Sequence, residues 1–416
     1  MRILIYSYNY YPEPIGIAPL MTELAEGLAQ RKHQVRVLTA MPWYPNSEIS
    51  PEYQGKLYVT EERNNVKIQR SFVWIRRQRN FFNRALFEIS FVVLSFFQAL
   101  KGSRPDVILL TIPGLPVCVP AAMLGWLYQA PIILNLQDIL PDAAVHVGLI
   151  RNSKMIRLFQ CLENFAYRTA TKISVISDGF TNNLLNKKVP REKIVEVSNW
   201  VDINFIKPLP KEDNYFLSEN NLHNKFVVLY SGNIALTQPL EILIDAAQKL
   251  DQIKDIVVVI VGKKKALERL EQYCQEKQIS NVILRPFQPR NKLPELLAAA
   301  DVGMVMQKSN VISFNMPSKI QLLLASGRPI IASVPNEGTA AKAIQRSGGG
   351  LVVPPEDSDA LAKAIERLYN DRELVVSLGK NGREYAKKHY NIETTLDKYE
   401  ELLLSLNQIG KKHYAL

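Results

Sequence analysis

The sequence predicts an α/β protein made of two doubly wound, Rossmann-like parallel-sheet domains. Apolar runs of four to seven residues alternate with longer stretches of helical periodicity, a pattern typical of βα units and parallel sheets. The 416 residues are also too many for one ordinary hydrophobic core. In such sheets ligands bind outside the carboxyl ends of the strands, so we expect the two domains to face each other across a cleft that holds the site.

The expected strands form two series. In the first half they are residues 2–6, 34–39, 66–70, 106–111, 131–136, 172–175 and 194–197. In the second half they are residues 226–231, 255–261, 282–284, 302–305, 329–332 and 350–352, again separated by helical stretches. Residues 204–224 are polar, contain two prolines and lack a long apolar period, so we place the interdomain linker there. The predicted domains are therefore residues 1–203 and 204–389, followed by a C-terminal helix within 390–416.

Residues 315–330 predict a loop that turns into a helix of about two and a half turns. Pro317 occupies a first helical position that needs no N–H donor, and Gly327 ends the helix. The free backbone N–H groups, the Ser318 hydroxyl and the Lys319 ammonium would then converge at a helix N-terminus, which already carries partial positive charge. Such an arrangement suits a diphosphate.

Composition and charge narrow the classes of function. Hydrophobic residues make up 47% and charged residues 22% of the chain, as in a folded globular protein. The net charge is +11, of which residues 1–200 carry +8, so the first half is expected to face an anionic partner or a merely solvated surface. Nucleic acid fits the charge, but the chain lacks helix-turn-helix, zinc and stacking-sheet signatures, so no nucleic-acid role is expected.

Cellular location follows from the cysteines and the N-terminus. Cys118, Cys161 and Cys274 lie far apart without metal-type spacing, which argues against a disulfide framework or zinc site and favours a reducing cytoplasm. A buried-strand pattern begins at Arg2, so we expect no signal peptide.

Residues 81–100 differ from the other predicted helices, because they are unusually rich in Phe, Leu and Val for a water-soluble domain. Arg84 and Glu88 interrupt the run, which makes it a poor transmembrane span. Its basic flank favours insertion into the interface of an anionic membrane, and a core helix of the first domain is the alternative. The predicted membrane residues are Arg76, Arg77, Arg79, Phe81 and Phe82.

Several motifs together carry a family resemblance. They are the turn Tyr10-Tyr11-Pro12-Glu13-Pro14-Ile15-Gly16-Ile17-Ala18, the stretch from Arg31 to Thr39, Asn199-Trp200-Val201-Asp202, Tyr230-Ser231-Gly232-Asn233, Val261-Gly262 and the stretch 315–330. In this order along nearly the whole chain, they resemble the retaining glycosyltransferases of family 4, which have the GT-B fold. The Pro317-Ser318-Lys319 variant looks most like the colanic-acid-biosynthesis type of sugar transferase. In such relatives the last helix crosses back onto the first domain.

The resemblance implies a set of donor-binding residues. The turn around Gly16 would approach the donor diphosphate from the first domain, and the loop and helix at Pro317 would approach it from the second. Strand ends of the second domain would supply the rest of the diphosphate and nucleobase contacts. The predicted donor-binding residues are Gly16, Gly232, Asn233, Lys263, Arg285, Phe287, Pro317, Ser318 and Lys319. A solvated role for the run of lysines that begins at Lys263 remains an alternative.

Acceptor residues are expected after a central strand of the first domain. Asp138 and Asp142 follow that strand, and His146 lies four residues beyond Asp142. A carboxylate there could position or deprotonate an acceptor hydroxyl. The alternative is that Asp142 caps a short helix and His146 packs nearby. We expect Asp138 and Lys319 to be the catalytic residues.

Two departures from the family pattern concern charge. Many relatives carry two glutamates eight positions apart, where this chain has Phe314 and Leu322. Relatives also often bring an Arg and a Lys from the first loop of the second domain, where this chain has Asn233 and Gln238. Because charge grows on the leaving diphosphate, other cations should substitute, and Lys319 and Lys263 are the nearest candidates.

The expected function is retaining transfer of a sugar, without a metal, from a nucleotide diphosphate donor, most simply a UDP-sugar, to an acceptor hydroxyl. The acceptor is expected to be a lipid-linked saccharide or polysaccharide precursor at the inner face of the cytoplasmic membrane. Two alternatives stay open: a GT-B nucleotide-sugar epimerase, and a non-catalytic glycosyltransferase-like binding subunit.

Overall fold

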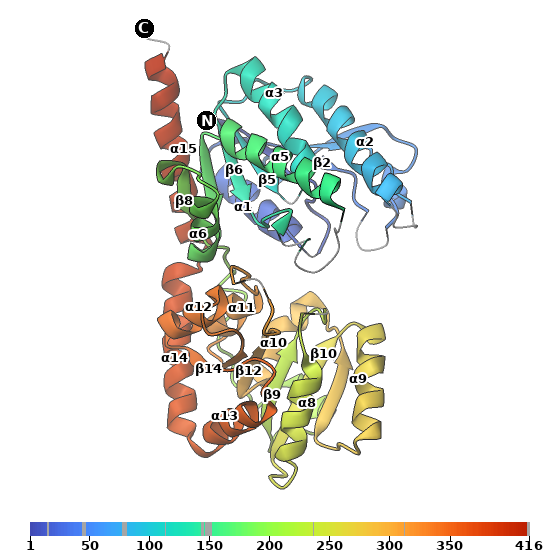
Figure 1. Cartoon of the computed structure of the whole chain (residues 1–416), viewed down its shortest axis with the longest axis vertical. Coiled ribbons are helices and arrows are strands. Elements are labelled where there is room, and N and C mark those ends of the chain that lie inside the picture. The colour runs from blue at the N-terminus through green and yellow to red at the C-terminus, as the bar shows by residue number, and fades with distance from the viewer. Residues whose placement is uncertain are drawn as a thin grey trace. The chain divides into compact units, whose positions relative to one another are not determined.

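The computed structural model describes residues 1–14, 16–43, 47–76, 81–112, 114–142, 145, 152–235, 237–311 and 313–413. The chain folds into two compact units (Figure 1). The first comprises Met1–Ser198 together with Thr395–Leu416, and the second comprises Asn199–Thr394.

The first unit is built on an eight-stranded sheet within the described ranges, in the order β3-β4-β2-β1-β5-β6-β7-β8. All neighbouring strands are parallel except β3 and β4, which are antiparallel. The strands are β1 (Arg2–Tyr6), β2 (Gln34–Ala40), β3 (Tyr58–Arg63), β4 (Val66–Ser71), β5 (Val107–Ile112), β6 (Ile132–Leu136), β7 (Lys172–Val175) and β8 (Ile194–Glu196). Its central strands are almost wholly buried, as expected for a parallel sheet covered on both faces.

Strand β3 is absent from the strands that the sequence predicted. It forms a hairpin with β4 through Asn64 and Asn65, whose φ angles are 49° and 63°. Both central residues of a tight two-residue hairpin need positive φ, which asparagine tolerates better than most residues. Because β3 lies at the sheet edge and is only partly buried, it lacks the apolar run that marked the other strands.

The helices that accompany this sheet in the described ranges include α1 (Ala18–Gln30), α2 (Phe81–Ala99), α3 (Cys118–Tyr128), α5 (Ser153–Thr169), α6 (Asp178–Asn186) and α15 (Ile392–His413). The C-terminal helix α15 packs on the first unit. The Arg31 guanidinium donates to the Glu400 carboxylate at 2.9 Å, and the hydroxyls of Ser174 and Tyr399 lie 3.3 Å apart in the core. The last helix therefore belongs to the unit formed by the start of the chain.

The second unit is built on a six-stranded sheet in the order β11-β10-β9-β12-β13-β14, parallel throughout. Its strands are β9 (Phe226–Ser231), β10 (Ile256–Gly262), β11 (Val282–Pro286), β12 (Val302–Met306), β13 (Ile330–Ser333) and β14 (Gly350–Val353). Its helices are α7 (Tyr215–Asn220), α8 (Leu240–Lys249), α9 (Lys264–Glu276), α10 (Leu293–Ala299), α11 (Lys319–Ala325), α12 (Thr339–Ser347), α13 (Ser358–Asn370) and α14 (Arg372–His389).

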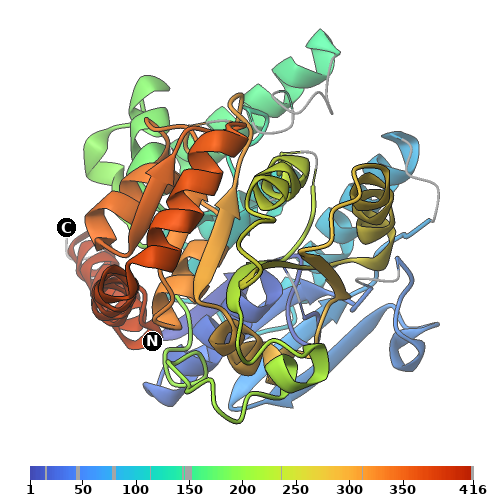
Figure 2. The same cartoon turned by 90° about the horizontal axis from the view of Figure 1, so that it is seen from below.

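Alternate residues of these strands build two hydrophobic cores, one on each face. Val227 and Leu229 of β9 pack in one core with residues of α10, α11, α12 and α14, while Val228 and Tyr230 pack in the other with residues of α8, α9 and α13 (Figures 1 and 2). The prediction of two doubly wound α/β domains is confirmed.

Residues 204–224, where the sequence placed the linker, pack within the second unit. Ile206, Phe216 and Leu217 of this stretch are buried in its core. The stretch lacks a long apolar period because its buried residues come from the short helix α7 and from irregular backbone.

The order of strands reverses between β1 and β5 in the first sheet and between β9 and β12 in the second. Doubly wound sheets bind ligands beside such reversal points, at the carboxyl ends of the strands. The candidate residues should therefore be sought around the ends of β1, β5 and β6 in the first unit, and of β9, β10 and β12 in the second.

Candidate functional site

The start of helix α11 differs from its sequence prediction. The helix begins at Lys319, two residues after Pro317, and ends before Gly327, whose φ is +70°. The Pro317 carbonyl accepts a hydrogen bond from the N–H of Ile320 at 3.1 Å, so one tight turn precedes the α-helix. Ser318 is exposed, and its side chain makes no capping hydrogen bond. The predicted glycine stop is confirmed, whereas the predicted start at Pro317 is wrong.

The Lys319 side chain reaches the end of strand β9. Its ammonium donates to the Tyr230 hydroxyl at 3.0 Å and lies 4.5 Å from the centre of the Tyr230 ring. The Tyr230 hydroxyl in turn donates to the backbone carbonyl of Asn233 at 2.8 Å. Desolvation lowers the pKa of Lys319 to about 8, and no nearby charge among the described residues offsets this effect. A poorly solvated cation without a carboxylate partner favours an anionic ligand.

Gly232 leaves room for this lysine. Its φ is +143°, and a Cβ atom there would collide with Cε of Lys319. Side chains other than glycine rarely adopt such a φ, so the backbone requires glycine at this turn, and a Cβ atom would also displace the flexible end of Lys319. Tyr230, Gly232, Asn233 and Lys319 thus form one group at the carboxyl end of β9, here termed the Lys319 cluster.

Lys263 and Phe287 lie along the same edge of the sheet. Lys263 directly follows β10, which pairs with β9, and its side chain is exposed. The N–H of Phe287 donates to the carbonyl of Gly262 at 3.1 Å, and the Phe287 ring is 45% exposed. The edge therefore offers one desolvated cation, one solvated cation and one accessible aromatic ring.

Arg285 is directed elsewhere. Its Nε donates to the side-chain oxygen of Asn220 at 2.6 Å, and its Nη1 donates to the Leu284 carbonyl at 2.9 Å. These bonds tie the guanidinium to α7 and to its own strand, so the structure does not join it to the Lys319 cluster.

The positions that depart from the family pattern have structural partners here. Leu322 packs against the hydrophobic core, and Phe314 is half-buried. The Gln238 side chain accepts a hydrogen bond from the N–H of Ala235 at 2.8 Å and so closes its own loop.

On the first unit, Gly16 precedes helix α1 with a φ of +71°, and a Cβ there would meet open space. The requirement for glycine at this turn is therefore one of backbone conformation, not of crowding.

Asp138 follows β6, the strand next to β5. Asp138 is exposed as a residue, yet the surrounding protein desolvates its carboxylate enough to raise its pKa to about 6. A carboxyl group with such a pKa exchanges protons near neutral pH, as a group that assists an acceptor hydroxyl must.

Asp142 lies in an ionic network. Its carboxylate contacts the Lys187 ammonium at 2.9 Å and accepts from the Asn183 amide at 3.1 Å, and Lys187 also contacts Glu163 at 2.6 Å. This network ties the segment after β6 to α5 and α6. His146 lies outside the described residues, so the acceptor role of this pair stays a prediction.

The predicted membrane segment forms the helix α2. Phe87 and Phe91 on one face are buried in the core, whereas Phe82 is 65% exposed. Arg76 is exposed beside Trp74, with its guanidinium carbon 5.7 Å from that ring. Arg77 and Arg79 lie outside the described residues, as does the side chain of Phe81. Among the described helices, none is long and apolar enough to cross a membrane.

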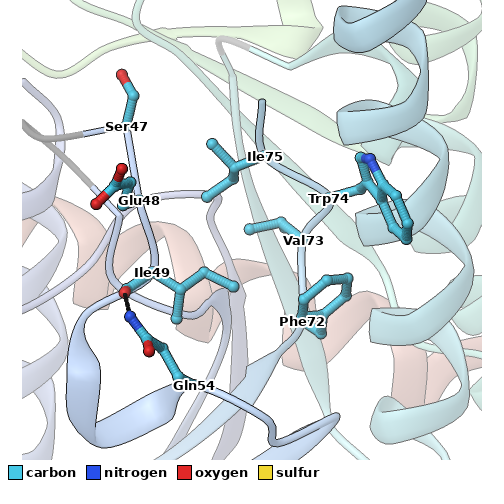
Figure 3. Close-up of a pocket in the computed structure, with 8 residues that line it drawn as sticks. All are labelled: Ser47, Glu48, Ile49, Gln54, Phe72, Val73, Trp74 and Ile75. Atoms are coloured by element: carbon cyan, nitrogen blue, oxygen red, sulfur yellow. Dashed lines mark hydrogen bonds between the residues drawn. The ribbon is translucent and has the colours of Figure 1, made fainter. Parts of the chain in front are cut away.

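A pocket that the sequence did not predict lies at the carboxyl end of β4. It has a volume of about 390 Å³ between the segments 47–54 and 72–75. Ile49, Val73 and Ile75 point into it, and the Gln54 amide donates to the Ile49 carbonyl at 3.1 Å (Figure 3). Two segments distant in sequence form the pocket, so no local motif marks it.

Tyr230 is the residue of the Lys319 cluster that sequence reasoning missed. It belongs to the motif Tyr230-Ser231-Gly232-Asn233, but as a buried strand residue it gave no sign of its contact with a lysine 89 positions later. No group of three or more His, Cys, Asp or Glu side chains suited to a metal was found in the part of the chain that the structure describes.

Comparison with known proteins identifies the family. The family description "Glycosyl transferase 4-like domain" matches residues 16–200, and "Glycosyl transferases group 1" matches residues 211–385. The colanic acid biosynthesis glycosyl transferase WcaI of Escherichia coli K12 is 31% identical over 98% of this chain and 100% of that protein. The chain belongs to the group 1 glycosyl transferases. The resemblance to family 4 glycosyltransferases is thereby confirmed, and this glycosyltransferase is an enzyme of the transferase class.

More distant relatives and similar solved structures are consistent with this family and its fold. The O-antigen chain mannosyltransferase C of Escherichia coli is 23% identical to this glycosyltransferase over 98% of this chain and 99% of that protein. The crystal structure of Anabaena Alr3699/HepE in complex with UDP has a TM-score of 0.73 at 18% identity and covers 97% of this chain and 100% of its own. The lipopolysaccharide-biosynthesis glycosyltransferase WaaG has a TM-score of 0.69 at 16% identity, covering 96% of this chain and 99% of its own. These likenesses confirm the GT-B fold.

Proposed function

We propose that this glycosyltransferase transfers a sugar from a nucleotide diphosphate donor, a UDP-sugar, to a hydroxyl of a lipid-linked glycan during polysaccharide biosynthesis. The observation that carries the proposal is the desolvated ammonium of Lys319, which lies over Gly232 at the carboxyl end of β9. Two similar proteins support it: WcaI is named for colanic acid biosynthesis, and HepE was crystallised in complex with UDP.

Lys319 and Lys263 would neutralise the donor diphosphate without a metal. The pyrophosphate would lie against the Gly232 turn, where glycine lets the backbone approach, with the Lys319 ammonium beside it. Phe287 would offer an exposed ring toward the nucleobase. Lys319 acts mainly as leaving-group charge develops, so it stabilises the transition state more than the bound donor.

The reaction is proposed to retain the configuration at the anomeric carbon. The bond between that carbon and the β-phosphate oxygen breaks, and a bond from the carbon to the acceptor oxygen forms on the same face. The proton of the acceptor hydroxyl passes to the departing phosphate oxygen, and the products are a glycoside and the nucleoside diphosphate. Asp138 would hold the acceptor hydroxyl in place by accepting its hydrogen bond before transfer.

The acceptor is proposed to be lipid-linked at the inner face of the cytoplasmic membrane. The positive charge of the first 200 residues, +8 of the total of +11, supports an anionic surface as the place of reaction. Arg76, Arg77, Arg79, Phe81 and Phe82 are the contact residues proposed from the sequence.

A thermal-shift comparison of UDP, GDP and their sugars tests the donor proposal, since a ligand that binds the native state raises apparent stability. We expect UDP and a UDP-sugar to raise the melting temperature more than the GDP compounds. Equal stabilisation by GDP would contradict the base assignment. Formation of an epimerised UDP-sugar without an acceptor would favour the epimerase alternative, and donor binding without transfer or hydrolysis would favour a binding subunit.

A further inference from the structure

Helices α2 and α3 of the first unit each expose a continuous apolar stripe. The exposed residues of the stripes are Phe82, Ile89, Val93, Phe97 and Leu100 at α2, and Val119, Met123, Trp126 and Leu127 on α3. Spacings of three or four residues place most of these side chains on one face of each helix. Helices α2 and α3 pack against each other in the first unit (Figure 1), and the exposed residues of the two stripes are together termed the α2–α3 face.

Trp126 is the most exposed large side chain of this face. It is 83% exposed, compared with 55% for Phe97 and 50% for Met123. A soluble surface seldom carries so many large apolar residues together, and patches of this kind mark sites of interaction. The helix α3 also contains no charged residue, so no long polar side chain covers its stripe.

Charges surround the face instead of lying on it. The only charged residues of α2, Arg84 and Glu88, form an ion pair with each other. Arg76 and Lys101 are exposed just beyond the two ends of α2. Arg104 donates from Nε to the Tyr128 carbonyl at 2.9 Å, which places it at the end of α3 that carries Trp126.

The rim is basic overall. Between residues 76 and 128 the carboxylates are Glu88 and Asp106, and Asp106 is paired with Arg2 at 2.6 Å. The exposed rim cations Arg76, Lys101 and Arg104 therefore have few carboxylates close to them in the sequence. An apolar face with a cationic rim matches an anionic phospholipid surface, which offers acyl chains beneath phosphate groups.

We propose that the α2–α3 face docks on an anionic lipid bilayer, with Trp126 of α3 as its principal anchor. A tryptophan in such a position would lie at the headgroup level, where its ring has an apolar body and a polar N–H. No described helix can span a bilayer, so the face lies on the membrane and does not cross it. A second copy of the chain fits less well, because a symmetric pairing of this face would bring its own basic rims together.

Docking on this face brings the unassigned pocket close to the membrane. The backbone N–H of Trp74, in the wall of that pocket, donates to the Ser90 hydroxyl of α2 at 2.9 Å. A substrate held in the bilayer by its lipid would thus lie beside the opening at the end of β4. In this respect the inference rests on the proposed lipid-linked acceptor.

The test is flotation of the full-length protein with vesicles of phosphatidylcholine containing about a quarter phosphatidylglycerol. We compare the wild type with the double variant Trp126→Gln/Phe97→Gln and with the control Val376→Gln, which removes a 70% exposed apolar residue from α14 of the second unit. The double variant should lose roughly tenfold or more in vesicle affinity, whereas the control should bind like the wild type. Raising the salt from about 0.05 M to 0.5 M should weaken binding of the wild type, because the basic rim is screened.

Tryptophan fluorescence supplies a second measurement. Lipids brominated on the acyl chain near the headgroup should quench the wild-type emission, and Trp126→Phe should reduce the quenching, with any remainder assigned to Trp74 beside α2. Because all these substitutions are at exposed positions, the variants should melt like the wild type.

Three outcomes would overturn the inference: absence of wild-type binding at low salt, equal vesicle binding by the double variant, or a dimer in sedimentation experiments that the double variant dissociates. The last result would assign the face to a second copy. Vesicle binding requires neither donor nor acceptor, so its failure leaves the thermal-shift test with UDP unaffected. Conversely, normal vesicle binding without a response to UDP would contradict only the donor proposal.

Discussion

Replacing Lys319 by methionine keeps most of the length of the side chain and removes its charge. If the ammonium binds the donor diphosphate, UDP affinity should fall roughly 30- to 1000-fold, since loss of one partner of a poorly solvated charge pair costs about 2–4 kcal/mol. Isothermal titration with UDP measures the change. Lys380→Met on α14, at an exposed position, is the matched control and should leave UDP affinity unchanged.

The same substitution should stabilise the unliganded second unit. The pKa of Lys319 is about 8 in the fold and 10.5 in the unfolded chain, which corresponds to a cost of about 3 kcal/mol while the lysine is charged. This cost is fully present below pH 8 and disappears as the pH rises toward 10.5. Loss of the hydrogen bond and ring contact with Tyr230 offsets about 1–2 kcal/mol. The net gain of about 1–2 kcal/mol should raise the melting temperature by about 5 °C at neutral pH.

The pH dependence of UDP binding tests whether the protonated form of Lys319 is the one that binds UDP. Free Lys319 is protonated below pH 8, and a bound diphosphate raises its pKa, so the wild-type Kd should be flat between about pH 7 and 8, where UDP is fully ionised, and rise about tenfold per pH unit above pH 8. The methionine variant should show no such rise. Wild-type UDP affinity in Lys319→Met, or a wild-type Kd that does not change between pH 7 and 9.5, would refute the reasoning.

Three further predictions concern other candidate residues. Gly232→Ala should displace the Lys319 side chain and reduce UDP affinity nearly as much as Lys319→Met, with a lower melting temperature from the strained backbone; unaltered binding would show that the two residues do not meet. For Asp138, whose pKa is about 6, acceptor-dependent kcat/KM should rise with pH through about 6, and Asp138→Asn should remove this limb and lower kcat by about 100-fold; a limb that survives would exclude Asp138. Lys263→Met should weaken UDP binding only about two- to fivefold, because solvent screens its exposed ammonium, and a larger loss would reverse the ranking of the two lysines.

Most strands could be predicted because buried parallel strands carry their own signal. A strand covered on both faces needs a run of apolar residues, as in Val257 to Val261, and such runs are visible without tertiary information. The edge strand β3 is half solvated, and its apolar and polar residues alternate only weakly. The Asn64-Asn65 turn was therefore the one local sign of this strand, and the sequence prediction did not use it.

Most residues of the Lys319 cluster could be selected from the sequence, but their contacts could not. Gly232, Asn233 and Lys319 were chosen from motifs, and the structure brings them together. The role of Tyr230 depends on a contact across 89 residues, and the pairing of Asp142 with Lys187 depends on how α6 packs. Neither is encoded in local spacing.

The exposed stripe on α3 shows a further limit of sequence patterns. A helix that is apolar throughout and contains no charge is usually a buried one, and periodicity alone cannot reveal which side lacks a partner. Only the packing of α3 against its neighbours shows that Trp126 faces outward.

This glycosyltransferase lacks two cations that its relatives often carry near the donor diphosphate. We therefore expect Lys319 to neutralise most of the charge of that diphosphate. Relatives often place an Arg and a Lys where this chain has Asn233 and Gln238, and here Gln238 is used to close its own loop. Two charges about 4 Å apart attract by about 1 kcal/mol in water but by about 4 kcal/mol where the effective dielectric constant is near 20. At the proposed donor site, Lys319, poorly solvated against Tyr230, would therefore supply most of the attraction that two exposed cations would supply elsewhere, and exposed Lys263 would add less. If the diphosphate binds there as proposed, it restores the stability that the fold loses by desolvating Lys319, so donor binding and folding of this unit would depend on the same ammonium group.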